Sequence, residues 1–237
     1  DRIFPKKDKL MFNYTIINIS SYHAAIKRKG LKIFNELKNS ARKLIIPIAR
    51  LIPLSPNTLT LLGFVVSIAA GAAFSLGKPF AGGFLILFSG FFDILDGGVA
   101  RAKGRITPFG GVLDSVCDRY SDGLMFLGII AGAVNGRLVL SPIVQIEGWL
   151  WAGFALIGSF LVSYTRARAE SAGCRKLSVG IAERTERMII LALGGISGFL
   201  GWALVLVAVF SHITIIQRVL RAKSILSKPS ESDFQKP

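Results

Sequence analysis

Charged residues and cysteines are both scarce in this chain of 237 residues. Only 18% of its residues are charged, compared with about 25% in a typical soluble domain, and 51% are hydrophobic. An intrinsically disordered chain is excluded, because such chains contain few apolar residues. The two cysteines, Cys117 and Cys174, show no CxxC or similar spacing, which argues against a disulfide framework or a zinc site. The composition therefore indicates an integral membrane protein.

Acidic residues are also scarce, since 14 of them are set against 29 basic residues and leave a formal net charge of +15. A nucleic-acid-binding domain can be this basic, but it is not this apolar, so we expect no nucleic-acid partner. The mean hydropathy of +0.54 favours instead a protein that spans a lipid bilayer with a basic cytoplasmic side.

Six apolar stretches are long enough, or nearly long enough, to cross a bilayer core, which takes about 20 helical residues. They lie at roughly 57–77, 80–100, 109–135, 145–165, 187–200 and 201–220. All but three of the basic residues (Lys78, Arg119 and Arg137) fall in segments that six spans would place on one side of the membrane. Basic segments stay in the cytoplasm. We therefore predict an all-α integral membrane protein with six transmembrane helices and both termini in the cytoplasm, located in the cell membrane.

The chain outside these spans divides into three short parts. Residues 1–22 form an N-terminal extension, and residues 226–237 form a polar tail. Between them, residues 51–225 hold the six-helix domain. Residues 23–50 alternate apolar and basic side chains at near-helical spacing, which predicts a juxtamembrane amphipathic helix. Such a helix either lies on the anionic cytoplasmic leaflet or packs on the bundle, and the sequence does not separate the two.

Five aspartates lie within the apolar stretches, where a charged side chain is energetically costly. Asp93 and Asp96 lie three residues apart at the cytoplasmic end of the second stretch, and Asp114, Asp118 and Asp122 lie four apart in the third. Such spacing places each set on one helix face. The connection between the two stretches is short, so the acidic faces should meet. Carboxylates that close do not all ionise unaided, and a hard divalent cation with oxygen ligands relieves the repulsion.

These residues form a long motif, which resembles the signature of the CDP-alcohol phosphatidyltransferase family. It reads Asp93-x-x-Asp96-Gly97-x-x-Ala100-Arg101, then eight residues, then Gly110-x-x-x-Asp114-x-x-x-Asp118. All eight fixed positions are filled with the family's spacing. The resemblance implies an enzyme of phospholipid biosynthesis that uses two Mg²⁺ or Mn²⁺ ions and forms a homodimer.

The resemblance also implies roles for individual residues. Asp93, Asp96, Asp114 and Asp118 would bind the metal ions, and Asp118 would also be the catalytic base that accepts the proton of the acceptor hydroxyl. The CDP-activated lipid, with diacylglycerol or archaeol, would be held by residues around the motif and by the entry to the first span. These residues are Asn57, Thr58, Leu59, Thr60, Gly97, Ala100, Arg101, Thr107 and Gly110.

The basic connection between the fourth and fifth stretches resembles the branch of phosphatidylinositol-phosphate synthases and their archaeal counterparts. In that branch a basic pocket binds the phosphate of inositol 1-phosphate, and the matching residues here are Ser163, Arg166, Arg187 and Arg218. Arginine suits a phosphate dianion because its planar fork donates two parallel hydrogen bonds. Glycerol 3-phosphate also carries a phosphate, so it remains an alternative acceptor, as do other alcohols.

Several charged residues have a simpler interpretation. Asp122 lies outside the motif, and we expect it to pair with Arg119 or another cation; Arg184 and Glu183 are expected in a salt-bridged cytoplasmic edge. Without the motif, an acidic cluster inside a membrane would indicate a cation transporter, and this is the alternative from another class of protein.

Overall fold

The computed structural model describes residues 49, 51–141, 143–174, 177 and 179–227. The chain divides into two compact units, Asp1–Pro53 and Leu54–Pro237. All the helices described below belong to the second unit. The predicted extension (1–22), nearly all of the predicted amphipathic helix (23–50) and nearly all of the polar tail (226–237) lie outside the described residues, so these divisions stay predictions.

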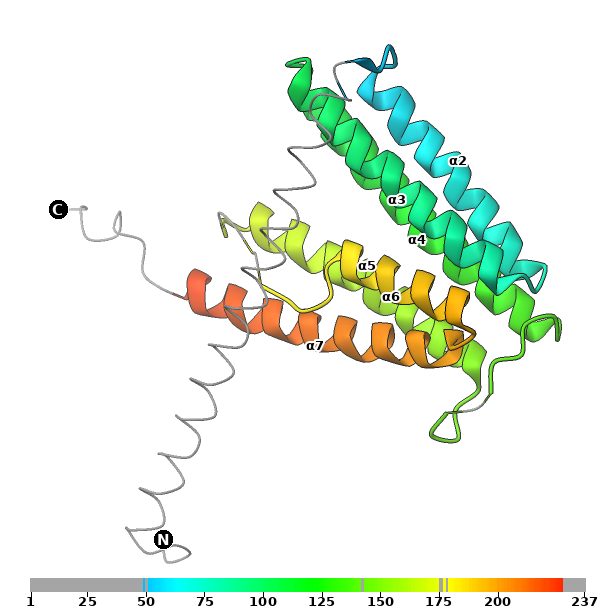
Figure 1. The fold of residues 1–237 in the computed structure, drawn as a ribbon. Helices are drawn as coiled ribbons and strands as arrows, with labels where there is room; N and C mark the ends of the chain where they lie inside the picture. The colour runs from blue at the N-terminus through cyan, green and yellow to red at the C-terminus, as the bar shows by residue number, and fades with distance from the viewer. Residues whose placement is uncertain (1–48, 50, 142, 175–176, 178, 228–237) are drawn as a thin grey trace, which may run out of the picture. The chain divides into compact units, whose positions relative to one another are not determined.

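Six helices make up the second unit, and no strand occurs in its described residues. Their bounds are α2 Pro56–Ser75, α3 Pro79–Ala102, α4 Pro108–Val134, α5 Gly148–Ser171, α6 Arg184–Ser197 and α7 Leu200–Leu226 (Figure 1). Each helix overlaps one of the six predicted stretches. The predicted all-α fold is therefore confirmed.

Proline and short polar side chains explain where the helices near the site begin. Each of α2, α3 and α4 has proline in its first turn, where the missing N–H costs nothing. Ser55 caps α2 by accepting a hydrogen bond from the Thr58 N–H, and Thr107 caps α4 by accepting one from the Gly110 N–H. The starts of α2 and α4 are therefore fixed by capping side chains.

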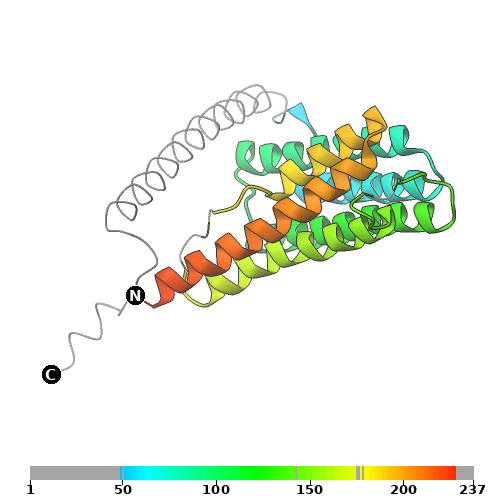
Figure 2. The same cartoon turned by 90° about the horizontal axis from the view of Figure 1, so that it is seen from below.

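The helices run up and down roughly along one direction, in two groups of three (Figures 1 and 2). In the first group, α2 packs on both α3 and α4; in the second, α7 packs on both α5 and α6. The groups meet where α3 contacts α6 and α4 contacts α5. Helices α3 and α4 make few close contacts with each other. Their acidic faces, which the sequence suggested would meet because the helices are neighbours, are thus held in place by α2 and α6.

Glycine allows α2 and α4 to approach closely. A methyl group on Gly128 of α4 would overlap the carbonyl oxygen of Gly71 on α2. A buried hydrogen bond of 2.7 Å from Ser67 to Ser121 joins the same two helices. Small residues that bring backbones together, with polar side chains bonded across the contact, are typical of helix packing in membranes.

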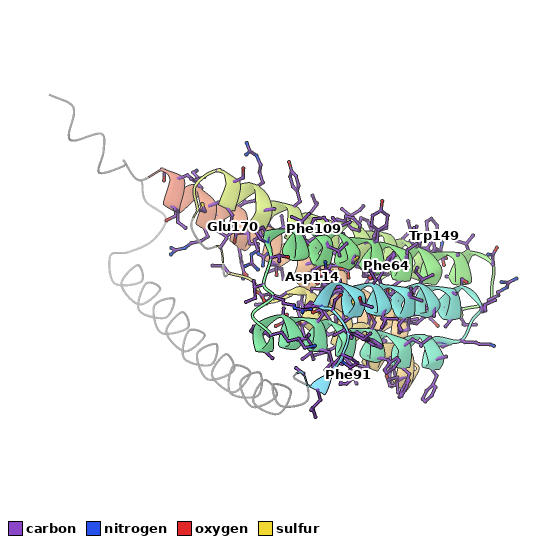
Figure 3. All side chains as sticks on the ribbon, turned by 90° about the horizontal axis from the view of Figure 1, so that it is seen from above. Phe64, Phe91, Phe109, Asp114, Trp149 and Glu170 are labelled. Carbon is purple, nitrogen blue, oxygen red and sulfur yellow. The ribbon has the colours of Figure 1, made fainter. Side chains whose placement is uncertain are left out.

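The outer faces of the bundle are apolar. Phe80, Phe84 and Trp202 are each more than half exposed, and Figure 3 shows Phe91 and Trp149 pointing away from the helices. A soluble monomer rarely exposes so much apolar surface. By length and composition, four of the described helices (α2, α3, α5 and α7) can cross a membrane. Helix α4 has 27 residues but carries several charges, and α6 has only 14, so the count of six spans stays a prediction.

We predict that Gly128→Ala lowers stability markedly. The added methyl group would push α2 and α4 apart, and overpacking of this kind costs about 1–3 kcal/mol. The measurement is the apparent Tm of the purified protein in detergent. Gly153→Ala in α5 is the matched control, because a methyl group there meets no described atom within 4 Å. Equal Tm values for the two variants would show that the Gly71–Gly128 contact is not tight.

Candidate active site

Three of the predicted metal ligands converge between α3 and α4. Asp93 on α3 and Asp114 and Asp118 on α4 each offer a carboxylate oxygen, and these oxygens lie within 4.8 Å of one another. Figure 3 places Asp114 among the helices, whereas Phe91 points outward. Asp93 remains exposed, with 42% of its side chain accessible, so the cluster opens to one side.

Asp96, the fourth predicted ligand, lies beside this cluster and is tied to α2. It is buried, at 7% exposure, and the Thr60 hydroxyl donates a 2.5 Å hydrogen bond to its Oδ2. Asp93, Asp96 and Asp118 all line one small cavity with Thr60. Asp96 thus has one oxygen held by Thr60 of α2, and it lies next to Asp93 and Asp118. The four predicted ligands therefore lie in one place.

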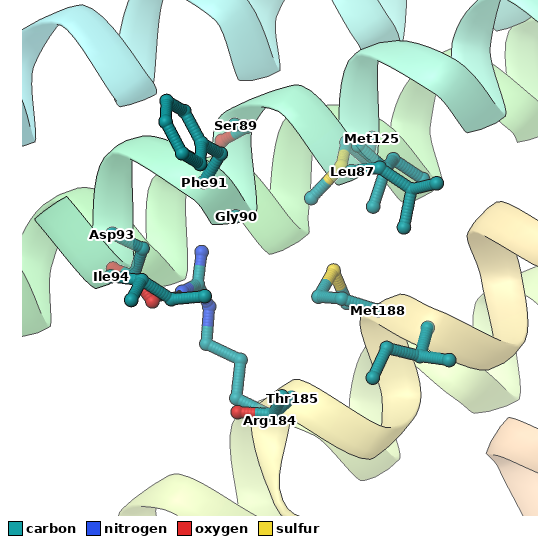
Figure 4. Close-up of a pocket in the computed structure, with 12 residues that line it drawn as sticks. Leu87, Ser89, Gly90, Phe91, Asp93, Ile94, Met125, Arg184, Thr185 and Met188 are labelled. Carbon is teal, nitrogen blue, oxygen red and sulfur yellow. Dashed lines mark hydrogen bonds and ion pairs between the residues drawn. The ribbon is translucent and has the colours of Figure 1, made fainter. Parts of the chain in front are cut away.

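Arg184, at the start of α6, reaches into the acidic cluster. Its Nη1 lies 2.7 Å from Asp118 Oδ1 and 3.2 Å from Asp93 Oδ2. Its Nε lies 3.1 Å from Asp122 Oδ1. A single guanidinium thus bridges three aspartates on two helices. Figure 4 shows this side chain extending from α6 toward Asp93. The sequence predicted only a salt-bridged edge for Arg184, and the structure places it at the centre.

Asp122 fixes two arginines rather than one. It is 2% exposed, and its Oδ2 lies 3.2 Å from Nη2 of Arg187, which is itself 1% exposed. Arg187 Nη1 also donates a 2.9 Å hydrogen bond to the Ala182 carbonyl. The expectation that Asp122 pairs with a cation is confirmed, but its partners are Arg184 and Arg187. Arg119 pairs instead with Asp118, at 3.2 Å.

The residues predicted to bind the CDP-lipid surround the acids. The starts of α2 and α4 come together, since a methyl group on Gly110 would lie 3.4 Å from Asn57 Oδ1 and 3.0 Å from Thr107 Oγ1. A methyl group on Gly97 would lie 3.2 Å from Nη1 of Arg101, so the guanidinium packs closely over this glycine. Leu59 is only 2% exposed, so its side chain belongs to the packed interior. Thr58 is exposed and Ala100 partly exposed in the same region.

The four residues predicted to bind the acceptor phosphate come from α5, α6 and α7. Arg166 is exposed and pairs with Glu170 at 3.1 Å, and the Ser163 hydroxyl donates to the Ser159 carbonyl. Arg218 is buried, with hydrogen bonds of 2.8 and 2.6 Å to the carbonyls of Val179 and Val162. Arg187 thus joins α6 to α4, and Arg218 joins α7 to α5 and to the segment before α6. The sequence did not suggest these structural contacts.

An apolar cavity of about 290 Å³ adjoins the acids (Figure 4). Asp93 and Arg184 lie at its polar end, and most of the remaining lining is aliphatic, aromatic or thioether. Polar groups that converge at one end of an apolar cavity are typical of a ligand site. This arrangement suits a ligand that has one charged part and one apolar part.

The donor set fits a hard divalent cation. Asp93, Asp114 and Asp118 supply only oxygen atoms, which Mg²⁺, Mn²⁺ and Ca²⁺ prefer, and the group contains no thiolate or imidazole. An all-helical bundle with apolar outer faces and such a cluster at one end defines a class of membrane-embedded, metal-dependent enzyme.

Comparison with known proteins agrees with this class and names the family. Residues 53–218 match the CDP-alcohol phosphatidyltransferase family. The chain is 42% identical over 194 residues to the archaetidylinositol phosphate synthase of Methanothermobacter thermautotrophicus, covering 79% of this chain and 93% of that protein. It is 40% identical to the phosphatidylinositol phosphate synthase of Mycobacterium tuberculosis, covering 73% and 82%. The chain belongs to the CDP-alcohol phosphatidyltransferase family.

Solved structures lead to the same family. The crystal structure of the Mycobacterium tuberculosis phosphatidylinositol phosphate synthase with CDP-DAG bound has a TM-score of 0.67 and 32% identity, covering 79% of this chain and 99% of that one. The same enzyme in complex with manganese and citrate has a TM-score of 0.66 and 34% identity, covering 78% and 93%. This chain is thus a multi-pass membrane enzyme of phospholipid biosynthesis rather than a cation transporter.

We predict that Asp122→Asn destabilises the protein strongly. The change leaves the buried Arg187 without its counter-charge, and breaking such a pair costs about 3–5 kcal/mol. The apparent Tm in detergent measures the effect. Glu170→Gln is the control, because it breaks the exposed pair with Arg166, which is worth less than about 1 kcal/mol. A Tm for Asp122→Asn that matches the control would contradict the structural role of Asp122.

Proposed function

We propose that this enzyme transfers the lipid-bearing phosphoryl group of a CDP-activated lipid to inositol 1-phosphate and releases CMP. The lipid carries diacylglycerol or archaeol. The single observation that supports this chemistry best is the convergence of Asp93, Asp114 and Asp118 beside an apolar cavity. The preference for inositol 1-phosphate rests on two named relatives, an archaetidylinositol phosphate synthase and a phosphatidylinositol phosphate synthase.

In this proposal Asp93, Asp96, Asp114 and Asp118 are the metal ligands. A bound Mg²⁺ or Mn²⁺ pair would neutralise the pyrophosphate and the charge that develops on the leaving phosphate. Asn57, Thr60 and the helix starts at α2 and α4 position the CDP group, since free N–H groups at a helix N-terminus attract phosphate. The subsite is completed by Thr58, Gly97, Ala100, Arg101, Thr107 and Gly110, whereas Leu59, predicted with them, packs in the interior instead.

Asp118 acts as the general base. It accepts the proton of the acceptor hydroxyl, whose oxygen then forms a bond to the phosphorus that carries the lipid. The bond from that phosphorus to the oxygen of CMP breaks, and CMP leaves with the electron pair. Asp118 is suited to this role because it is held on a helix and is largely shielded, with 17% of its side chain exposed.

The acceptor phosphate binds to Ser163, Arg166, Arg187 and Arg218. Among the described residues Arg166 pairs only with Glu170 and only through Nε, so its two terminal nitrogens can donate to a phosphate. Arg187 Nε is buried and has no hydrogen-bond partner among the described residues, so a phosphate oxygen would satisfy it. Three arginines are more than an uncharged acceptor needs, which is why we place inositol or serine below a phosphorylated alcohol.

The same proposal includes the wider architecture. Six helices cross the membrane, with the acids and both termini on the cytoplasmic side of the cell membrane. The up-and-down order of the helices (Figure 1) and the concentration of basic residues in alternate connections of the sequence support this topology. We also expect a homodimer, as the family resemblance implies.

The first test is a panel of acceptors. We predict that the purified protein, given a CDP-lipid and Mg²⁺ or Mn²⁺, releases CMP fastest with inositol 1-phosphate, more slowly with glycerol 3-phosphate and hardly at all with inositol or serine. Asp118→Asn is the control and should bind CDP-lipid without turnover. Preference for glycerol 3-phosphate would overturn the acceptor, and CMP release with none of the phosphorylated alcohols would overturn the function.

The second test concerns the acceptor pocket. We predict that Arg166→Gln raises the KM for inositol 1-phosphate by about tenfold or more and leaves the KM for CDP-lipid nearly unchanged, because one charge-assisted hydrogen bond to the phosphate is lost. Steady-state kinetics with each substrate varied in turn provide the measurement. Arg168→Gln removes an equal, exposed charge from the same helix and should behave as wild type. An equal rise in both KM values would place Arg166 outside the pocket.

A further inference from the structure

The contacts of Arg184 conflict with the metal site in its present arrangement. Asp118 Oδ1 lies 2.7 Å from Arg184 Nη1, and Asp118 Oδ2 lies 3.2 Å from Arg119. Both oxygens of the proposed base and ligand are therefore paired with guanidinium groups. Asp93 Oδ2 is paired with the same Nη1, at 3.2 Å. A cation bound through Asp93 Oδ2 and Asp118 Oδ1 would take the place that Arg184 Nη1 holds.

Arg184 nevertheless has an anchor that does not involve the proposed ligands. Its Nε lies 3.1 Å from Asp122 Oδ1, and Asp122 is buried and also holds Arg187. A swing of the planar guanidinium as one unit about the hydrogen bond from Nε, through the torsions of the aliphatic part of the side chain, can therefore withdraw Nη1 while Nε keeps its partner. The adjoining cavity, which Arg184 itself lines, provides space for that movement.

We propose that Arg184 is the internal counter-ion of the carboxylate cluster, which neutralises Asp93 and Asp118 in the metal-free protein and is displaced by the divalent cation. The role rests on the proposed metal site. It explains how aspartates so close together stay compatible before metal binds, because a guanidinium with two donor atoms facing three carboxylates relieves their repulsion. It also makes metal binding an exchange of one cation for another, so Arg184 weakens metal affinity while it stabilises the metal-free fold.

The experiment compares wild type, Arg184→Gln and Arg168→Gln in detergent, by Mn²⁺ binding followed with electron paramagnetic resonance and by apparent Tm in EDTA and in Mn²⁺. Arg184→Gln should bind Mn²⁺ at least about tenfold more tightly than wild type, since a competing charge is gone. Its Tm in EDTA should fall, and Mn²⁺ should raise that Tm more than it raises the wild-type Tm. Arg168→Gln, which loses an exposed arginine, should match wild type in every measurement.

Three results separate the possible failures. If Arg184→Gln binds Mn²⁺ as wild type does, or more weakly, the counter-ion role is wrong. If wild type binds no Mn²⁺ at all, the metal site of the proposed function is wrong as well. If Arg184→Gln does not fold, Arg184→Lys is used: a lysine keeps the charge but not the fork that spans Asp122 and Asp118 together, so its Mn²⁺ affinity should lie above that of wild type. An unchanged affinity in that variant would also overturn the role.

Discussion

Repulsion between carboxylates inside a membrane protein is the constraint on which the rest of this structure depends. Asp93, Asp114 and Asp118 offer oxygens within 4.8 Å of one another, a separation at which like charges interact strongly. Bound cations or protonation must therefore relieve the repulsion within such a cluster. The protein supplies arginines at this point, and the proposed function needs a divalent cation at the same point. The arginine ion pairs and the proposed metal ion would therefore occupy the same small region.

The two helix groups are joined where that charge is compensated. Arg184 and Arg187 come from the start of α6, and Asp122 comes from α4, so their ion pairs connect the first group of helices to the second. Asp122 is buried and is not one of the proposed metal ligands, so in the proposed exchange it can stay paired while the neighbouring acids change partners. Close packing of α2 on α4 fixes the acidic face of α4 at the same time. The active site is therefore part of the framework that holds the bundle together.

The sequence predicted the helices and the motif well, because both are local signals. Apolar runs bounded by Pro56, Pro79 and Pro108 locate the helix starts closely, and the spacing of Asp114 and Asp118 determines a shared helix face. The sequence could not predict the position of Arg184. Its partner Asp122 is 62 residues away, and the contact between them depends on how α6 packs on α3. The three-residue spacing of Arg184 and Arg187 was a signal for a paired basic face, but it does not name the acid that receives it. The buried bonds of Arg218 to two carbonyls also arise from packing alone.

The central claim is that the carboxylate cluster binds a divalent cation. Asp114 tests it most directly, because Asp114 enters no ion pair within the described part of the chain, and its replacement by asparagine removes one ligand charge without breaking a salt bridge. Equilibrium binding of Mn²⁺ to the purified protein, followed by electron paramagnetic resonance, is the measurement. The account predicts saturable binding to wild type, and binding weakened by about a hundredfold in Asp114→Asn with no loss of Tm in EDTA. Equal Mn²⁺ affinity in the two proteins would contradict it.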